Sequence, residues 1–415
     1  MSRVVIVDGF SSGKFVAKAL RERGCTLIHV ASSATLDDYY YMGFDASIYE
    51  CLIVNKQLEA TVERVATFDP QYIIAGAETG VLLSDWLNEQ LNLPYRNQFN
   101  RTQARRNKFE MIRCVADAGL PAAQQAIVES WSAAKAWILG HGRFPVVLKP
   151  LDSAGADGVY ICDDLQDCEV AFGKVLGTTN RLNIRNAQVL IQEYLVGVEY
   201  VVNMVSLGAR QMVTEVVRYR KERLDSGSVI YDIDELVSPA EPECELLVDY
   251  TRKVVRSLGI ENGPSHAEVM LTEKGPRLVE IAARTDGILR PEVSEQTTGL
   301  GQIRATVMSI VEPEQFERLL DAQVGYELLL HSYNVCLINR SPGCFTKELF
   351  LSELLKLESY FYSVFYVGSG QPIGMTKDVF SQPGTIYLVH ADNAVIKADY
   401  LKLRALEAVG AYLAP

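Results

Sequence analysis

The chain has 415 residues, of which 48% are hydrophobic and 22% are charged. At roughly 150 residues per domain, this length predicts two or three domains. The hydrophobic fraction is large enough for true hydrophobic cores and excludes a wholly disordered chain. Acidic side chains (52) outnumber basic ones (40), which gives a net charge of -12. A surface of that sign repels phosphate backbones, so nucleic acid and anionic membranes are excluded as general partners.

The cysteines and the N-terminus indicate a cytoplasmic protein. The eight cysteines are scattered without a CxxC pair, which argues against a disulfide scaffold or a zinc site. The N-terminus enters a strand at once and lacks the apolar core of a signal peptide. No run approaches the roughly 18 apolar residues that a membrane span needs.

Strands and helices alternate in the first part of the chain. The first strand is a short, continuous apolar run, which is typical of a strand buried on both faces. This alternation predicts a parallel α/β domain. The predicted elements are a strand at 3–8, a helix at 14–23, a strand at 26–30, a helix at 56–67 and a strand at 72–75.

The turn after the first strand only partly matches a phosphate-binding loop. Gly9 and Gly13 are separated by three residues, and Phe15 follows Lys14. A Walker A loop needs four residues between its glycines, and Ser or Thr after its lysine. We therefore interpret the segment as a turn between a strand and a helix.

A basic cluster precedes the next predicted helix, which ends at Gly119. Lys108 lies beside Arg101, Arg105 and Arg106 in an otherwise acidic chain. A solvated helix face explains such a cluster as well as an anion site does.

The segment 144–149 is a predicted buried strand with Lys149 at its end, and a loop of small residues follows it. Ser153, Gly155 and Gly158 in this loop would let backbone amides approach phosphate oxygens, while the lysine supplies a point charge. Any glycine-rich hairpin would look similar, so the signal is moderate.

A strand, a connector and a second strand follow over 189–202. The exposed backbone of such a connector can pair with an adenine edge, and the Glu199 carboxylate can accept from ribose hydroxyls. The alternative for Glu199 is an ordinary surface acid on a strand.

Two apolar strands flank a predicted three-residue loop at 273–275, with Gly275 at its left-handed position. Glu268 and Glu280 are equidistant from the loop and should face each other across the hairpin. Facing carboxylates repel without a cation between them. Magnesium bound to nucleotide phosphates is the natural cation, and Arg284 follows closely enough to add a positive charge.

These segments, in this order, resemble the ATP-grasp superfamily over roughly residues 1–320. The resemblance implies an α/β and α+β fold: an N-terminal parallel α/β domain (1–121), a small lid (122–192) and a C-terminal antiparallel domain (193–415) with a terminal subdomain from about 321. The motif from Glu280 to Arg284, with His266 upstream, is similar to the L-amino-acid ligase branch. The segment 374–390 resembles that branch's closing strands.

The resemblance also implies roles for individual residues. One departure is Ala282, where most members carry an Asn metal ligand. His266 would orient substrate or take a proton, and a structural histidine is an equal alternative. The implied roles are phosphate contact by Lys108 and Lys149, lid-loop contact by Ser153, Gly155 and Gly158, backbone contact to adenine at Glu193 and Leu195, ribose binding by Glu199, Mg2+ (or Mn2+) binding by Glu268 and Glu280, and oxyanion stabilisation by Arg284 and the Gly287 N–H.

The implied activity is an ATP-dependent, ADP-forming ligase that joins an amino acid or acyl amino acid to an amino acid through an acyl phosphate. Its partners would be small amino-acid substrates, bound near Glu78, His266 and 286–290, and the family suggests a homodimer. Two alternatives remain open. One is an ATP-grasp carboxylase or purine-pathway ligase, and the other is a nucleotide-binding module without catalysis.

Overall fold

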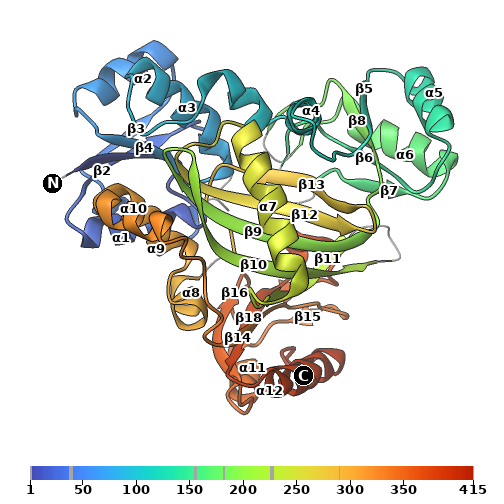
Figure 1. Cartoon of the computed structure of the whole chain (residues 1–415). Helices are drawn as coiled ribbons and strands as arrows, with labels where there is room; N and C mark the ends of the chain where they lie inside the picture. Colours follow the sequence, from blue (N-terminus) through green and yellow to red (C-terminus); the bar gives the residue numbers. More distant parts are fainter. Residues whose placement is uncertain are drawn as a thin grey trace.

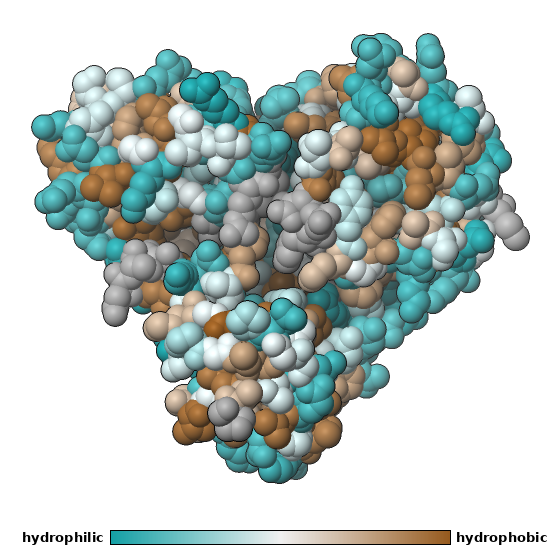
Figure 2. Space-filling model, turned by 180° about the vertical axis from the view of Figure 1, so that it is seen from behind, coloured by the Kyte–Doolittle hydropathy of each residue, from teal (hydrophilic) through white to brown (hydrophobic). Residues whose placement is uncertain are grey.

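The computed structural model describes residues 2–36, 41–153, 157–180, 183–224, 229–288 and 290–414. Three lobes surround one large antiparallel sheet (Figure 1). Seen from behind, the molecule is hollowed between its two upper lobes (Figure 2).

The N-terminal lobe is the predicted parallel α/β unit. Its four strands are all parallel, in the order β3-β2-β1-β4. All five predicted elements are present within two residues of their expected ends. Strand β3 was not predicted. It is a four-residue edge strand, and its Leu52 and Val54 side chains are exposed. The elements are β1 (Arg3–Val7), α1 (Gly13–Glu22), β2 (Thr26–Ala31), β3 (Cys51–Val54), α2 (Leu58–Ala66), β4 (Tyr72–Ala75) and α3 (Val81–Gln90).

A 3-10 segment (Phe99–Arg105) and helix α4 (Lys108–Asp117) lead out of this lobe. The Asn107 side chain caps the start of α4 by accepting from two backbone N–H groups, which fixes where the helix begins. Lys108 is therefore the first residue of the helix.

The second lobe is a four-stranded antiparallel sheet in the order β5-β8-β6-β7, covered by two helices. Its apolar side chains form a core separate from that of the large sheet, including Ile138, Val146, Leu148, Phe172 and Ile191. The elements are β5 (Gln125–Val128), α5 (Trp131–His141), β6 (Val146–Lys149), β7 (Tyr160–Cys162), α6 (Leu165–Val175) and β8 (Val189–Glu193).

The large sheet has eight strands in the order β13-β12-β9-β10-β11-β14-β18-β16. Helix α7 (Pro242–Ser257) lies across one face, where it buries Leu247, Val254 and Val255 (Figure 1). The strands are β9 (Gly197–Leu207), β10 (Arg210–Arg223), β11 (Val229–Leu236), β12 (Gly263–Thr272), β13 (Gly275–Ala282), β14 (His331–Cys336), β16 (Tyr360–Phe365) and β18 (Gly384–His390).

The C-terminal part of the chain extends this sheet, because β14, β18 and β16 continue it beyond β11, and it adds a separate two-stranded sheet of β15 and β17. Of the segment 374–390, which we expected to hold closing strands, only 384–390 is a strand; Val379–Ser381 is a 3-10 turn. No helix in the described ranges is long and apolar enough to cross a membrane. The remaining elements are α8 (Pro291–Thr298), α9 (Gln302–Val311), α10 (Pro313–Asp321), β15 (Gly343–Cys344), α11 (Lys347–Leu354), β17 (Pro372–Ile373) and α12 (Asn393–Ala408).

Candidate active site

Glu268 and Glu280 are paired directly opposite each other across β12 and β13, as predicted. The predicted three-residue loop is wrong, however, because Thr272 pairs with Gly275 and only two residues form the turn. That turn alone would place Val279 opposite Glu268. A bulge at Val279 shifts the register by one residue and restores the facing pair. Gly275 has a φ of +97°, the left-handed conformation that was expected.

Lys108 joins this pair from helix α4. Its Nζ donates to Glu280 Oε1 at 2.9 Å and to the Ser153 carbonyl at 3.0 Å, and only 5% of the residue is exposed. The lysine therefore links the large sheet to the loop after β6.

Two arginines of the basic cluster, Arg105 and Arg106, are buried rather than solvated. Arg105 is fully buried and donates to Asp85, while Arg106 pairs with Glu78 and Asp152. Among the four basic residues only Arg101 is exposed. The alternative of a solvated helix face is thus wrong for the rest of the cluster.

Lys149 at the end of β6 is buried and donates to Gln192 Oε1 on β8 at 2.9 Å. Burial, together with the charge of Lys108, lowers its pKa to about 8 although nearby carboxylates oppose the shift. Two lysines held close together in a buried position create a site for anions.

A cavity of about 490 Å³ lies between the strands of the second lobe and the large sheet. Four residues predicted to bind ATP line it: Lys149, Glu193, Leu195 and Glu199. The Glu193 carboxylate accepts a hydrogen bond from the backbone N–H of Gln124 at 2.9 Å, so this side chain is held against the start of the second lobe. The structure thus brings the adenine, ribose and phosphate candidates around one space.

The structure describes the loop after β6 as far as Ser153 and again from Asp157. Ser153 is buried, and its hydroxyl donates to the Asp157 carbonyl at 3.2 Å. Gly158 has a φ of +70°, and a Cβ there would come within 2.9 Å of Pro150. The position therefore requires glycine. Gly155 lies outside the described residues.

Glu199 faces Glu268 and Lys221 on neighbouring strands. Lys221 Nζ donates to Glu199 Oε1 at 2.7 Å, yet burial and Glu268 raise the pKa of Glu199 to about 7. Burial also opposes ionisation of Glu268, but His266 and Lys221 hold its pKa well below the usual value. Of the two facing acids Glu199 and Glu268, Glu268 therefore ionises more readily.

His266 is buried at the centre of a polar row on the large sheet. Its Nδ1 lies 2.9 Å from Asn203 Oδ1 and 3.5 Å from Asp286 Oδ2, and its Nε2 lies 3.7 Å from Glu268 Oε1. Ala282 is opposite it on β13, where the family commonly has Asn. His266 therefore lies between Asn203 and Asp286 on one side and Glu268 on the other.

Arg284 and Gly287 lie where the N-terminal lobe meets the sheet. Arg284 Nε donates to Glu78 at 3.1 Å, and its Nη1 donates to the Thr285 carbonyl at 2.9 Å. Although burial favours the neutral acid, Arg106 and Arg284 lower the pKa of Glu78. The Ser11 hydroxyl is 3.5 Å from the Gly287 carbonyl, so the turn after β1 closes this side of the site.

Mg2+ fits the residues present. Within the described ranges no group of three or more His, Cys, Asp or Glu side chains is arranged to hold a metal. Two facing carboxylates suit an ion that takes its remaining ligands from phosphates and water, which is the preference of Mg2+.

Sequence reasoning did not identify several of the polar residues at the site. Three of them carried a signal, because Gln192 precedes Glu193 and because Asn203 and Glu215 interrupt apolar runs, whereas Lys221 and Asp234 lie in charged stretches that give none. The missed residues are Gln192, Asn203, Glu215, Lys221 and Asp234.

The comparisons with known proteins agree with this geometry. The ATP-grasp domain family matches residues 142–292. The chain is 31% identical to dapdiamide A synthase from Enterobacter agglomerans over 411 residues, which covers 98% of this chain and 96% of the relative.

Two solved structures share the fold along almost the whole chain. One is an L-amino acid ligase from Bacillus licheniformis, with a TM-score of 0.76, 17% identity and coverage of 98% and 97%. The other is N5-carboxyaminoimidazole synthase from Aspergillus clavatus in complex with ADP and 5-aminoimidazole ribonucleotide. It has a TM-score of 0.70, 15% identity and coverage of 98% of each chain. The chain therefore belongs to the ATP-grasp family of ATP-dependent ligases.

Proposed function

We propose that the enzyme activates the carboxylate of an amino acid or acyl amino acid with ATP and joins it to the amine of a second amino acid. The products are ADP, phosphate and a dipeptide or peptide-like amide. The observation that carries this proposal is the contact of Lys108 with Glu280, opposite Glu268 and beside the 490 Å³ cavity.

The cavity residues divide between the base, the ribose and the phosphates. The backbone at Glu193 and Leu195 offers hydrogen bonds to adenine, and Glu199 offers its carboxylate to the ribose hydroxyls. Lys149, together with Lys108 outside the cavity lining, would bind the phosphates. Mg2+, held by Glu268 and Glu280, would neutralise charge on the phosphoryl oxygens.

In the first step a carboxylate oxygen attacks the γ-phosphorus, the bond to the β-phosphate oxygen breaks, and ADP leaves. Negative charge is spread over the phosphoryl oxygens during this transfer, so fixed cations provide most of the catalysis. Lys108 and Lys149 are held in place by Glu280 and Gln192, which reduces the reorganisation that the reaction requires.

In the second step the amine nitrogen attacks the carbonyl carbon, loses a proton, and expels phosphate as the carbon–oxygen bond breaks. The tetrahedral oxyanion needs donors aimed at it. Among the described contacts of Arg284, Glu78 and Thr285 engage Nε and Nη1, which leaves Nη2 for the substrate. The Gly287 N–H would be the second donor, and His266 would act as a positioning residue for Glu268.

Isotope transfer tests the acyl phosphate directly. An amino acid labelled with 18O in its carboxylate is incubated with Mg2+-ATP and each of a panel of amino acids, and phosphate and product masses are read together. One 18O atom should appear in the phosphate, and ADP rather than AMP should accumulate. Unlabelled phosphate alongside amide product would contradict the proposed chemistry.

The same assay separates the alternative activities. ADP formation that depends on bicarbonate, and not on amino-acid pairs, would indicate a carboxylase. Nucleotide binding without turnover of any pair would indicate a non-catalytic module. We expect the enzyme to act in the cytoplasm, where ATP is available.

A further inference from the structure

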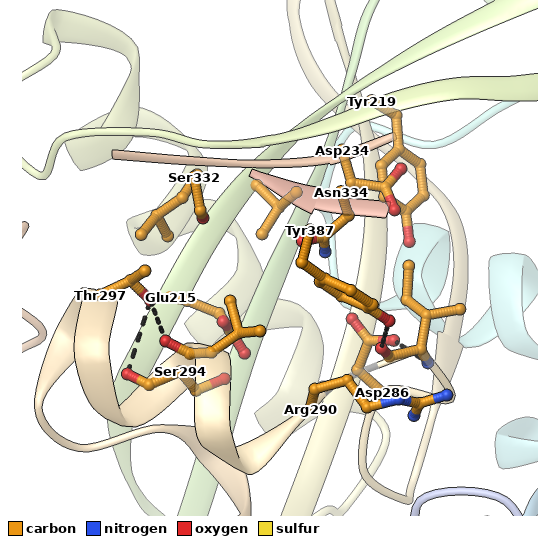
Figure 3. A pocket seen from close by; sticks show the side chains of 14 residues that line it. Glu215, Tyr219, Asp234, Asp286, Arg290, Ser294, Thr297, Ser332, Asn334 and Tyr387 are labelled. Carbon is orange, nitrogen blue, oxygen red and sulfur yellow. Dashed lines mark hydrogen bonds between the residues drawn. The ribbon is translucent and has the colours of Figure 1, made fainter. Parts of the chain in front are cut away.

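A second, smaller cavity adjoins the nucleotide cavity on the same face of the large sheet. It measures about 30 Å³, and Tyr219 on β10 lines both cavities. A void of this size holds one water-sized group. Its walls come from β10, β11, β14, β18, helix α8 and the residues Asp286, Ile288 and Arg290 before that helix (Figure 3).

One continuous row of the sheet forms the floor of this cavity. Tyr219 pairs with Asp234, Asp234 pairs with Asn334, and Asn334 pairs with Tyr387 on four consecutive strands. Residues paired in this way project from the same face of a sheet, and all four line the void. The Tyr387 hydroxyl donates to the Ile288 carbonyl at 2.9 Å, which anchors the loop that forms the opposite wall (Figure 3).

Three oxygen acceptors in this row receive no hydrogen bond from the described part of the chain. Asp234 is 1% exposed, and no described residue donates a hydrogen bond to either of its carboxylate oxygens. Asn334 Oδ1 is likewise buried without a described partner. A buried carboxylate is costly unless it is paired, and protein structures seldom leave such groups unsatisfied. An ammonium group brings three donors and no acceptor, which matches this set.

The surroundings are acidic as well. Glu215 and Asp286 also line the void, and Arg290 is the one described cation in its lining. Lys221 lies near Asp234 but donates to Glu199. Burial raises the pKa of Asp234 well above its usual value and that of Glu215 to about 7. A cation in the void would therefore restore the charge that burial disfavours.

We propose that this cavity receives the side-chain ammonium of a basic amino acid, and that one of the two substrates of the ligase is such an amino acid. The inference rests on the proposed function and specifies its substrate class. Asp234 would be the specificity-determining residue, with Asn334 as its second acceptor.

The position of the cavity favours a side-chain ammonium over an α-ammonium. Strands β9 and β10 separate Asp234 on β11 from Glu268 on β12. An α-ammonium is two bonds from the reacting carboxyl and stays near the metal pair. A side-chain ammonium several methylene groups away can extend along the sheet past Tyr219.

Substrate binding tests the proposal without turnover. Lysine, ornithine, norleucine and 6-aminohexanoate are titrated calorimetrically into enzyme saturated with a non-hydrolysable ATP analogue and Mg2+. Lysine or ornithine should bind roughly 10- to 100-fold more tightly than norleucine, the range expected for hydrogen bonds to a charged group. 6-Aminohexanoate, which lacks an α-ammonium, should keep part of this advantage. Equal binding of lysine and norleucine would overturn the proposal, and so would binding that requires only the α-ammonium.

The variant Asp234→Asn identifies the residue. It should fold, because it replaces a buried unpaired acid by a neutral side chain of the same shape, and its melting temperature should be unchanged or higher. Its preference for lysine over norleucine should fall roughly 10- to 100-fold. Glu235→Gln is the matched control, because Glu235 is the adjacent residue on the other face of β11 and pairs with Arg218. An unchanged preference in Asp234→Asn would overturn the proposal. It would indicate that Asp234 is a protonated acid that pairs with Asn334 instead of binding an ammonium group.

Turnover separates this proposal from the proposed function. ADP and amide formed from neutral pairs but never from basic amino acids would refute the ammonium site and leave the ligase assignment intact. No amide from any pair, basic or neutral, would refute the ligase proposal itself.

Discussion

Lys108 and Glu280, 172 residues apart in the chain, are joined by a contact of 2.9 Å between Nζ and Oε1. The lysine begins α4, and the glutamate faces Glu268 across a bulged hairpin. Two segments far apart in the chain thus meet where phosphate and metal would bind.

Replacing Glu280 by Gln should lower kcat/KM for ligation by at least about 100-fold, because the change keeps the shape but removes a charge that holds Mg2+. The Mg2+ concentration needed for half-maximal rate should rise. Glu273→Gln on the exposed turn of the same hairpin is the control and should behave like the parent. Near-normal phosphate release by Glu280→Gln at low Mg2+ would refute the metal role.

Arg284→Lys should lower kcat by about 100-fold while nucleotide affinity stays near that of the parent. Lysine supplies a charge but not the planar fork that can hold Glu78 and the substrate together. Steady-state rates and ATP-analogue titrations measure the two effects separately, with the exposed Arg304→Lys as control. Parent-like amide synthesis would leave Arg284 as a structural partner of Glu78 only, and lost nucleotide binding would place it in the ATP site.

Nucleotide binding should take up a proton at Lys149. Its pKa is lowered to about 8 by burial and by Lys108, so at pH 9 the free enzyme holds this amine mostly neutral. Bound phosphates favour the ammonium, so uptake should approach one proton at pH 9 and vanish near pH 6.5, and affinity should fall as the pH rises above 8. Calorimetry in buffers with different ionisation heats measures the uptake. Lys149→Arg remains charged and should show none, so equal uptake by this variant would assign the proton elsewhere.

Arg105→Leu should destabilise the protein by about 3 kcal/mol or more, because it leaves Asp85 buried without its cation. Thermal unfolding should begin roughly 10 °C lower. Arg101→Leu, in the same cluster but exposed, should melt like the parent. If both variants melt alike, the buried pair contributes nothing to stability.

The sequence by itself determined the local chemistry and most of the elements. Apolar runs and glycine turns predicted β1, α1, β2, α2 and β4, because these patterns depend on neighbouring residues alone. The facing of Glu268 and Glu280 was also predictable, since a hairpin is a local structure. Its turn was not, because the bulge at Val279 compensates for a shorter loop.

Only the tertiary structure decided which distant side chains meet. The basic cluster reads as a solvated face until folding buries Arg105 against Asp85 and brings Lys108 to Glu280. Likewise Asp234 is one acid among many in the sequence, and its isolation depends on β14 and β18 joining the sheet beyond β11. Burial and partner choice depend on strand order and register across the whole sheet, and no local pattern encodes them.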